Sequence, residues 1–168
     1  MSGTPETTRP GYLLTGGCQC GAVRYGLKSR PQEASICHCR MCQKAFGNYF
    51  APLAQIVRED LDWTRGAPAL FRSSTIVTRG FCRDCGTPLT YDYEAGPTLS
   101  VSLGSLDDPA AVPPLLQDGI EGVMPFFATL HLLPAMQTED NMPEGSLDRL
   151  RSFQHPDHDT GTWPPADA

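Results

Sequence analysis

The chain has 168 residues, of which 40% are hydrophobic and 19% charged, and this excludes two large domains and wholesale disorder. Sixteen Pro and sixteen Gly interrupt long helices and favour short strands joined by tight turns. Residues 1–90 hold eleven Lys or Arg against six Asp or Glu, and residues 91–168 hold two against thirteen. The resulting net charge of −6 argues against a nucleic-acid partner.

The predicted elements are short throughout. Residues 1–11 are expected to be a disordered tail, residues 12–143 a single domain and residues 144–168 a flexible extension. Five prolines in residues 106–141 predict an extended wrap across the sheets rather than a helix. Composition and turn boundaries predict, in chain order, a strand over Ala22–Leu27, a helical turn over His38–Phe46, a strand over Phe50–Val57, a helical turn over Arg58–Trp63, and strands over Leu70–Ser73, Thr75–Phe81, Pro88–Tyr93 and Thr98–Leu103.

The compartment can be inferred from the N-terminus and from hydropathy. The opening MSGTPETTRP has neither the basic start nor the apolar run of a secretory signal, and no apolar run approaches the roughly 18 residues that span a bilayer. We therefore expect a cytoplasmic protein without a membrane partner. In that reducing compartment, clustered cysteines are expected to be metal ligands or catalytic groups rather than disulfides.

The seven cysteines occur in three groups at metal-ligand spacings: CQC at residues 18–20, CHCRMC at 37–42 and CRDC at 82–85. In such a turn two sulfurs converge on one ion, and backbone N–H groups donate to the thiolates. A glycine follows the first and third groups, as Gly21 and Gly86, and permits the reversed backbone of the turn. This parallel predicts one closed site, a structural zinc held by Cys18, Cys20, Cys82 and Cys85.

The remaining group, Cys37, Cys39 and Cys42, is called the cysteine trio below. Three ligands leave the fourth position of a zinc free for water, a thiolate or an oxygen of an aldehyde hydrate. A zinc in such a site can deprotonate a bound thiol at neutral pH, so the trio is the candidate catalytic centre. His38 could be a fourth ligand, although its neighbours on both sides already direct sulfurs at the metal. A redox cluster or a second structural site are the alternatives.

Three stretches extend these groups: GGCQCGAVRY at residues 16–25, CHCRMCQKAFG at 37–47 and TRGFCRDCGTPLTY at 78–91. With them the sequence resembles the glutathione-dependent formaldehyde-activating enzyme family, which includes the centromere protein V group. The resemblance implies an all-β, Mss4-like fold of packed antiparallel sheets with zinc knuckles and few helical turns. It also implies a structural zinc on the four cysteines above, a second, labile zinc on the trio, and a carbon–sulfur lyase that joins formaldehyde and glutathione to S-(hydroxymethyl)glutathione.

The chain departs from the family pattern at Gln43, where many members read Cys-Arg-Lys after the last cysteine of the trio. This removes one cation that could meet a glutathione carboxylate, and leaves Arg40 and Lys44 as the predicted substrate-binding residues. His131 is a candidate acid or base, with a packed histidine as the alternative. We expect a zinc-dependent enzyme that acts on a small thiol, glutathione or an analogue, and an aldehyde. The rival hypothesis is a non-enzymatic zinc module that recruits a protein partner or senses metal or thiols.

Overall fold

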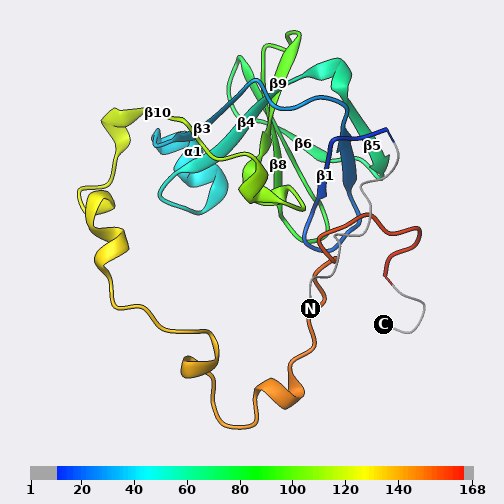
Figure 1. Cartoon of the computed structure of the whole chain (residues 1–168). Coiled ribbons are helices and arrows are strands. Elements are labelled where there is room, and N and C mark those ends of the chain that lie inside the picture. Colours follow the sequence, from blue (N-terminus) through cyan, green and yellow to red (C-terminus); the bar gives the residue numbers. More distant parts are fainter. Residues whose placement is uncertain (1–10, 165–168) are drawn as a thin grey trace.

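The computed structural model describes residues 11–164, and strands dominate it as far as residue 118 (Figure 1). Almost all of the tail predicted over residues 1–11 lies outside this range. Within residues 11–164 the one α-helix is α1 (Arg40–Phe46), and 3₁₀ turns cover Arg58–Asp60, Leu103–Ser105, Pro109–Ala111, Ile120–Gly122, Phe127–Leu132, Glu139–Asn141 and Leu147–Arg149. The strands are β1 (Leu14–Gly17), β2 (Arg24–Leu27), β3 (Glu33–Cys37), β4 (Ala51–Val57), β5 (Leu61–Arg65), β6 (Ala69–Arg72), β7 (Val77–Phe81), β8 (Pro88–Tyr93), β9 (Thr98–Ser102) and β10 (Leu116–Asp118).

The strands form two sheets. A small antiparallel sheet has the order β1-β2-β5, and a larger sheet has the order β10-β3-β4-β9-β8-β7-β6. Neighbours in the larger sheet are antiparallel, apart from β10, which runs parallel to β3. The prediction of an all-β, Mss4-like fold with few helical turns is confirmed. No helix within residues 11–164 is long and apolar enough to cross a membrane.

Strands occur at all six predicted positions, and β8 has the predicted bounds. The helical turn predicted over Arg58–Trp63 is wrong in its second half, because the 3₁₀ turn stops at Asp60 and β5 begins at Leu61. Pairing with β2 overrides the local preference of these residues for a helical turn. In this pairing Trp63 lies opposite Tyr25, and the centres of the two rings are 5.9 Å apart in an edge-to-face contact. Strands β1, β3, β5 and β10 were not predicted, since each is short and lacks clear alternation.

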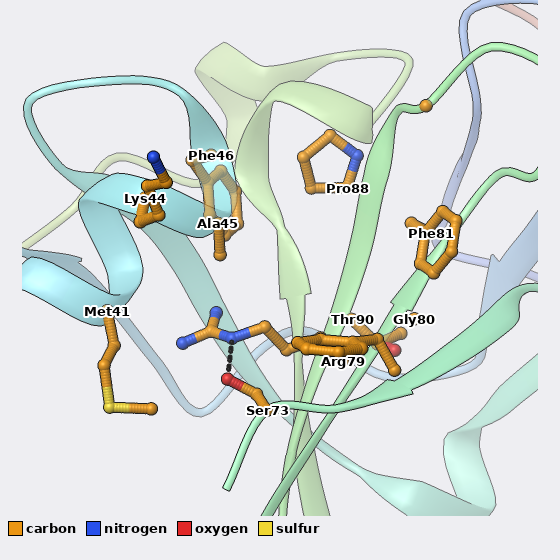
Figure 2. A pocket seen from close by; sticks show the side chains of 12 residues that line it. Met41, Lys44, Ala45, Phe46, Ser73, Arg79, Gly80, Phe81, Pro88 and Thr90 are labelled. Atoms are coloured by element: carbon orange, nitrogen blue, oxygen red, sulfur yellow. Dashed lines mark hydrogen bonds between the residues drawn. The ribbon is translucent and has the colours of Figure 1, made fainter.

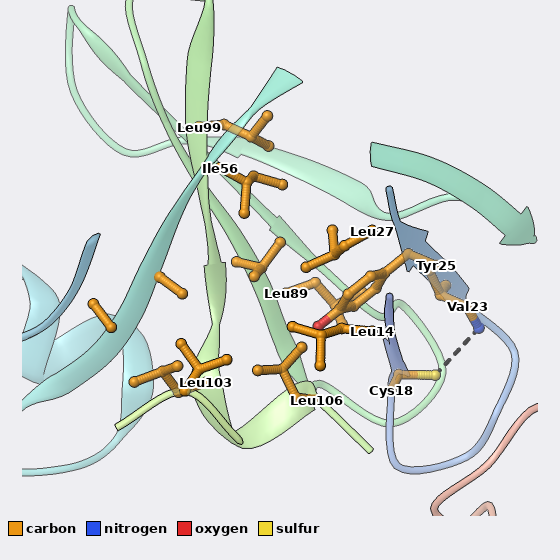
Figure 3. Packing of buried hydrophobic residues seen from close by; sticks show 14 of the residues in the cluster. Leu14, Cys18, Val23, Tyr25, Leu27, Ile56, Leu89, Leu99, Leu103 and Leu106 are labelled. Atoms are coloured by element: carbon orange, nitrogen blue, oxygen red, sulfur yellow. Dashed lines mark hydrogen bonds between the residues drawn. The ribbon is translucent and has the colours of Figure 1, made fainter. Parts of the chain in front are cut away.

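The hydrophobic core fills the space between the two sheets (Figure 3). Leu14, Tyr25 and Leu27 enter it from the small sheet, and residues such as Ile56 and Leu89 enter it from the larger one. The Tyr25 hydroxyl is satisfied by Ser105 at 2.8 Å, as a fully buried hydroxyl must be. Two metal-ligand candidates, Cys18 and Cys82, belong to the same buried cluster. The four-cysteine cluster therefore lies at one end of the core, where it joins the two sheets.

The prediction for residues 106–141 holds in part. The chain stays on the body through β10 and as far as Phe127, whose ring packs on His38 and Phe50. It then runs away from the sheets as an irregular, mostly exposed segment up to about residue 153 (yellow to orange in Figure 1). Leu132 and Leu133 are 70% and 63% exposed, so these two apolar side chains do not anchor the segment to the sheets by burial. From residue 154 the chain returns to the turn between β1 and β2.

Candidate metal and substrate site

The four-cysteine cluster combines two turns that are distant in sequence. Cys18 and Cys20 lie in the turn after β1, and Cys82 and Cys85 lie in the turn after β7. The four sulfurs lie within 4.8 Å of one another, with Cys20 Sγ 3.5 Å from Cys18 Sγ and 3.7 Å from Cys82 Sγ. This arrangement brings together all four of the predicted ligands, and it could hold a metal ion.

Both turns have the hydrogen bonds of a metal-binding knuckle. The Val23 N–H donates to Cys18 Sγ at 3.2 Å, and Thr87 Oγ1 lies 3.2 Å from Cys85 Sγ. Thr87 Oγ1 also accepts from the Gln19 N–H at 3.0 Å, which links one turn to the other. Burial opposes the charged form of Cys85, but the hydrogen bonds from Thr87 outweigh it and lower the pKa of this thiol to about 6. The cluster therefore presents an anionic sulfur to an arriving cation near neutral pH.

Residues 154–163, called the C-terminal clamp below, cover this cluster from outside. The Trp163 Nε1–H donates to the Cys20 carbonyl at 2.6 Å, and the His155 N–H donates to the Gln19 carbonyl at 2.7 Å. Asp159 accepts from the buried Arg24 at 2.9 Å. The flexibility predicted for residues 144–168 remains a prediction, but these contacts attach the second part of that extension to the β1–β2 turn.

The cysteine trio is formed where β3 gives way to α1. Cys37 ends β3, Cys39 is the N-cap of α1, and Cys42 lies in the first turn of the helix. Their three sulfurs lie within 4.8 Å of one another and could hold a metal ion. Within residues 11–164 no fourth His, Cys, Asp or Glu ligand atom joins that set. The structure thus brings together the three sulfurs of the trio, and its role as a three-ligand metal site remains a prediction.

The three thiols of the trio differ in how easily they ionise. Burial raises the pKa of the Cys39 thiol, but hydrogen bonds from the Cys42 N–H, from the Cys37 and Cys42 thiols and from the Met41 N–H outweigh it and lower that pKa overall. Burial raises the pKa of the Cys37 thiol to about 12. Burial raises the pKa of the Cys42 thiol, and the Arg79 guanidinium opposes this rise. Arg79 Nη2 lies 3.4 Å from Cys42 Sγ, so the guanidinium is a counter-ion to the trio.

Arg79 is the functional residue that sequence reasoning missed. It is 7% exposed, its Nε donates to Ser73 Oγ at 3.1 Å (Figure 2), and its Cζ lies 5.0 Å from the centre of the Tyr91 ring. Its Nη1 has no hydrogen-bond partner in the described part of the chain. The available signal was its position in β7, three residues before Cys82, but nothing in the spacing placed β7 opposite α1.

Residues after β10 fix the backbone of the trio. A Cβ at Gly119 would lie 2.7 Å from the Cys39 backbone nitrogen, and a Cβ at Gly122 would lie 2.4 Å from the His38 carbonyl oxygen. The buried Gln43 amide donates to the Gly122 carbonyl at 2.7 Å. The glutamine that departs from the family pattern therefore anchors α1 to this segment.

Two cavities meet beside the trio. The first, the trio cavity, has a volume of about 410 Å³ and is lined by all three cysteines of the trio. Its lining combines apolar and aromatic side chains with a rim of polar ones, namely Glu33, Ser35, Gln55, Ser74, Ser100 and Asp118. The second, the apolar cavity, has a volume of about 510 Å³ and lies between α1 and strands β6 to β8 (Figure 2). Arg79 and Met41 line both cavities. Each volume falls in the range of small-molecule sites, about 300–1,000 Å³.

The other predicted site residues are more dispersed. Lys44 is exposed at the edge of the apolar cavity, whereas Arg40 lines a separate hollow with Gln43 and Tyr49. The His38 ring points away from the sulfurs, since its Nε2 lies 2.9 Å from Gln117 Oε1 and the ring packs on Phe127 at 4.7 Å. His131 is exposed on the segment that leaves the body and lines neither cavity.

Comparison with known proteins assigns a family to the folded body. A model of the family described as glutathione-dependent formaldehyde-activating enzyme matches residues 13–118, a range that contains every cysteine and ends at β10. Among solved structures, a crystal structure of a Rhodobacter sphaeroides protein is 26% identical, with the similarity covering 61% of this chain and 98% of that chain at a TM-score of 0.49.

Proposed function

The chain belongs to the glutathione-dependent formaldehyde-activating enzyme family, and on that premise we propose that it is a zinc-dependent carbon–sulfur lyase. Its substrates would be a small thiol, glutathione or an analogue, and an aldehyde such as formaldehyde, which it would join to an S-hydroxymethyl adduct or release from one. The observation that carries the proposal is the pair of unequal cysteine clusters, with four sulfurs in one and three in the other.

Zinc fits the donor set of both clusters. A Zn–S distance of about 2.3 Å in tetrahedral geometry separates two sulfur ligands by about 3.8 Å, and the separations of 3.5 and 3.7 Å in the four-cysteine cluster are close to this value. Four thiolates would close that site, so we assign a structural zinc to Cys18, Cys20, Cys82 and Cys85. The trio would hold the second, labile zinc, which when bound would lower the pKa of an incoming thiol and act as a Lewis acid.

The residues around the trio provide charge and orientation. Hydrogen bonds at the start of α1 favour the thiolate form of Cys39, and the Arg79 guanidinium partly offsets the burial that raises the pKa of the Cys42 thiol. A bound zinc would supply the remaining stabilisation of the thiolates. The two cavities provide room for two small substrates to meet at the sulfurs. Holding both substrates there would make their reaction effectively unimolecular, with the reacting atoms already oriented.

The remaining contacts of the thiol are also proposed. Arg40 and Lys44 together line a hollow beside α1, where they would attract a carboxylate of the thiol. We give His131 no role in the reaction, because it is exposed away from both cavities. All seven cysteines are free of disulfides, which accords with the proposed cytoplasmic location.

Exchange NMR on the zinc-loaded protein with formaldehyde and glutathione tests the function. We expect the protein to accelerate interconversion of free glutathione and its hydroxymethyl adduct over the spontaneous rate. Cys39→Ser should remove the acceleration together with one of two zinc ions per chain. Failure to accelerate with any thiol and aldehyde pair would overturn the enzymatic proposal.

Metal exchange separates this function from the non-enzymatic rival. A chelator titration should reveal one resistant and one exchangeable zinc, and glutathione should change the exchange rate of the second. Two inert ions, unaffected by thiols, would instead support a zinc module that acts by scaffolding.

A further inference from the structure

The apolar cavity beside the trio has no use in a reaction of formaldehyde with glutathione alone. Formaldehyde has no substituent to fill a volume of about 510 Å³. Glutathione carries charged ends, for which the cavity offers only Lys44 and Arg79, and burying charged groups against the apolar remainder of the wall is costly. Polar groups come from Lys44, Ser73, Arg79 and Thr90, and the apolar part of the wall is made by side chains from α1 and from strands β6 to β8, namely Met41, Ala45, Phe46, Phe71, Phe81 and Pro88 (Figure 2).

The same cavity exposes apolar side chains that a folded protein would otherwise bury. Phe71 is 61% exposed and Met41 is 47% exposed, although both belong to the ordered body of the protein. Exposed apolar groups that gather around a hollow are typical of a binding site. The cavity adjoins the trio cavity at Arg79 and Met41, which line both.

Register explains why Arg79 stands between the two cavities. In the sheet Arg79 lies opposite Phe71 of β6 on one side and Tyr91 of β8 on the other. Residues opposite one another point to the same side of a sheet, so all three side chains lie on the face toward α1. One end of the guanidinium contacts the Cys42 sulfur, and Nη1 lacks a partner among residues 11–164. An unpaired N–H on a buried cation is costly, and an oxygen acceptor supplied by a ligand would remove that cost.

We propose that the apolar cavity receives the hydrocarbon substituent of an aldehyde larger than formaldehyde, whose carbonyl oxygen accepts a hydrogen bond from Arg79. This inference rests on the proposed function and names its aldehyde class. The polar thiol takes the trio cavity, where the rim offers hydrogen-bonding groups. The two substrates then meet with the aldehyde carbon between Arg79 and the sulfurs.

The step is balanced without an oxidant or reductant. The thiol's S–H bond breaks as its proton passes to water, a lone pair on the sulfur forms the S–C bond, and the π electrons of the carbonyl move onto its oxygen. That oxygen accepts a proton from water and becomes the hydroxyl of an S-(1-hydroxyalkyl) adduct. Arg79 is a catalytic residue in this arrangement, because its N–H faces the oxygen on which negative charge develops.

Butanal and hexanal test the cavity, because their carbonyl groups are alike and their spontaneous rates with glutathione should match. In exchange NMR on the zinc-loaded protein, kcat/KM should rise about fourfold for each methylene that enters the cavity. Ala45→Phe fills the cavity from an exposed position of α1 and should abolish the preference for hexanal. Ala110→Phe, at an exposed site outside both cavities, is the matched control and should retain it.

The failure of this inference is distinct from failure of the proposed function. Accelerated turnover of formaldehyde with no gain from butanal to hexanal would overturn the inference and leave the function standing. Binding is measured separately from turnover by titrating the unreactive analogue hexanamide into ¹⁵N-labelled protein. Amide shifts in α1 and β7 that disappear in Ala45→Phe support the cavity, and their absence in the parent protein overturns it.

Arg79→Lys tests the contact with the oxygen, because it retains the charge but loses the planar donor fork. We expect kcat to fall about 100-fold for butanal and hexanal alike, with the preference for hexanal and the zinc content unchanged. Unchanged kcat would remove Arg79 from the reaction. Loss of the labile zinc would assign it to holding the trio instead.

Discussion

Replacing one cysteine in each cluster should separate their two roles. Cys82 is 1% exposed and belongs to the core between the sheets, and its sulfur lies 3.7 Å from Cys20 in the opposite turn. A structural zinc contributes on the order of 10 kcal/mol in small zinc domains, whereas whole domains are stable by only about 5–15 kcal/mol. Cys82→Ser should therefore leave little or no folded protein.

Cys39→Ser should have a much smaller effect on folding. Cys39 is the N-cap of a helix of only seven residues, and serine is a good N-cap residue, so its replacement should change the melting temperature by a few degrees, equivalent to about 1 kcal/mol. Circular dichroism melts and zinc counted per chain measure both effects. Equal losses of stability in the two variants, or loss of both ions in Cys39→Ser, would refute the division into a structural and a functional site.

Three further predictions concern the surroundings of the clusters. Removing residues 154–168 deletes the contacts of Trp163 and His155 and should speed chelator extraction of the zinc in the four-cysteine cluster, measured with a chromogenic chelator. Burial, aided by the charge of Arg24, lowers the pKa of His155, so the folded protein favours the neutral ring. The contribution of His155 to the free energy of unfolding is therefore full above about pH 6.5, and it is lost as the pH falls through the lowered pKa of the folded state. Melts across pH 4–8 should show this loss, and His155→Gln should flatten it. Gly122→Ala places a Cβ 2.4 Å from the His38 carbonyl oxygen and should weaken zinc binding at the trio, measured by competition with the same chelator.

Each of these predictions has a matched control. Removing only residues 165–168 should leave extraction of the structural zinc at the rate of the whole chain, and equal acceleration by both deletions would contradict a role for the C-terminal clamp. A pH profile unchanged in His155→Gln would assign the loss of stability to another group. Gly104→Ala adds a Cβ with no atom within 4 Å, so it should leave zinc affinity unchanged, and an effect as large as that of Gly122→Ala would contradict the steric argument.

The sequence predicted the division of seven cysteines into four and three because spacing and flanking glycines are local signals. The strands with clear turn boundaries were predicted for the same reason. It could not predict β5 or β10, whose short segments are strands only because a partner strand is present. Arg79 was missed because its role arises from register: β7 places it opposite Phe71 and Tyr91, and α1 then covers that face. The domain bounds, the assignment of zinc and the substrate contacts of Arg40 and Lys44 remain predictions.

The approach of Gly119 and Gly122 to the backbone of His38 and Cys39 makes the geometry of the trio depend on residues some eighty positions further along the chain. A single side chain gained at either glycine would displace the peptide that aims the sulfurs, with all three cysteines still present. Both glycines lie just beyond residues 13–118, the range that the family model matches. The presence of the three cysteines is therefore not sufficient in this chain for the arrangement of their sulfurs.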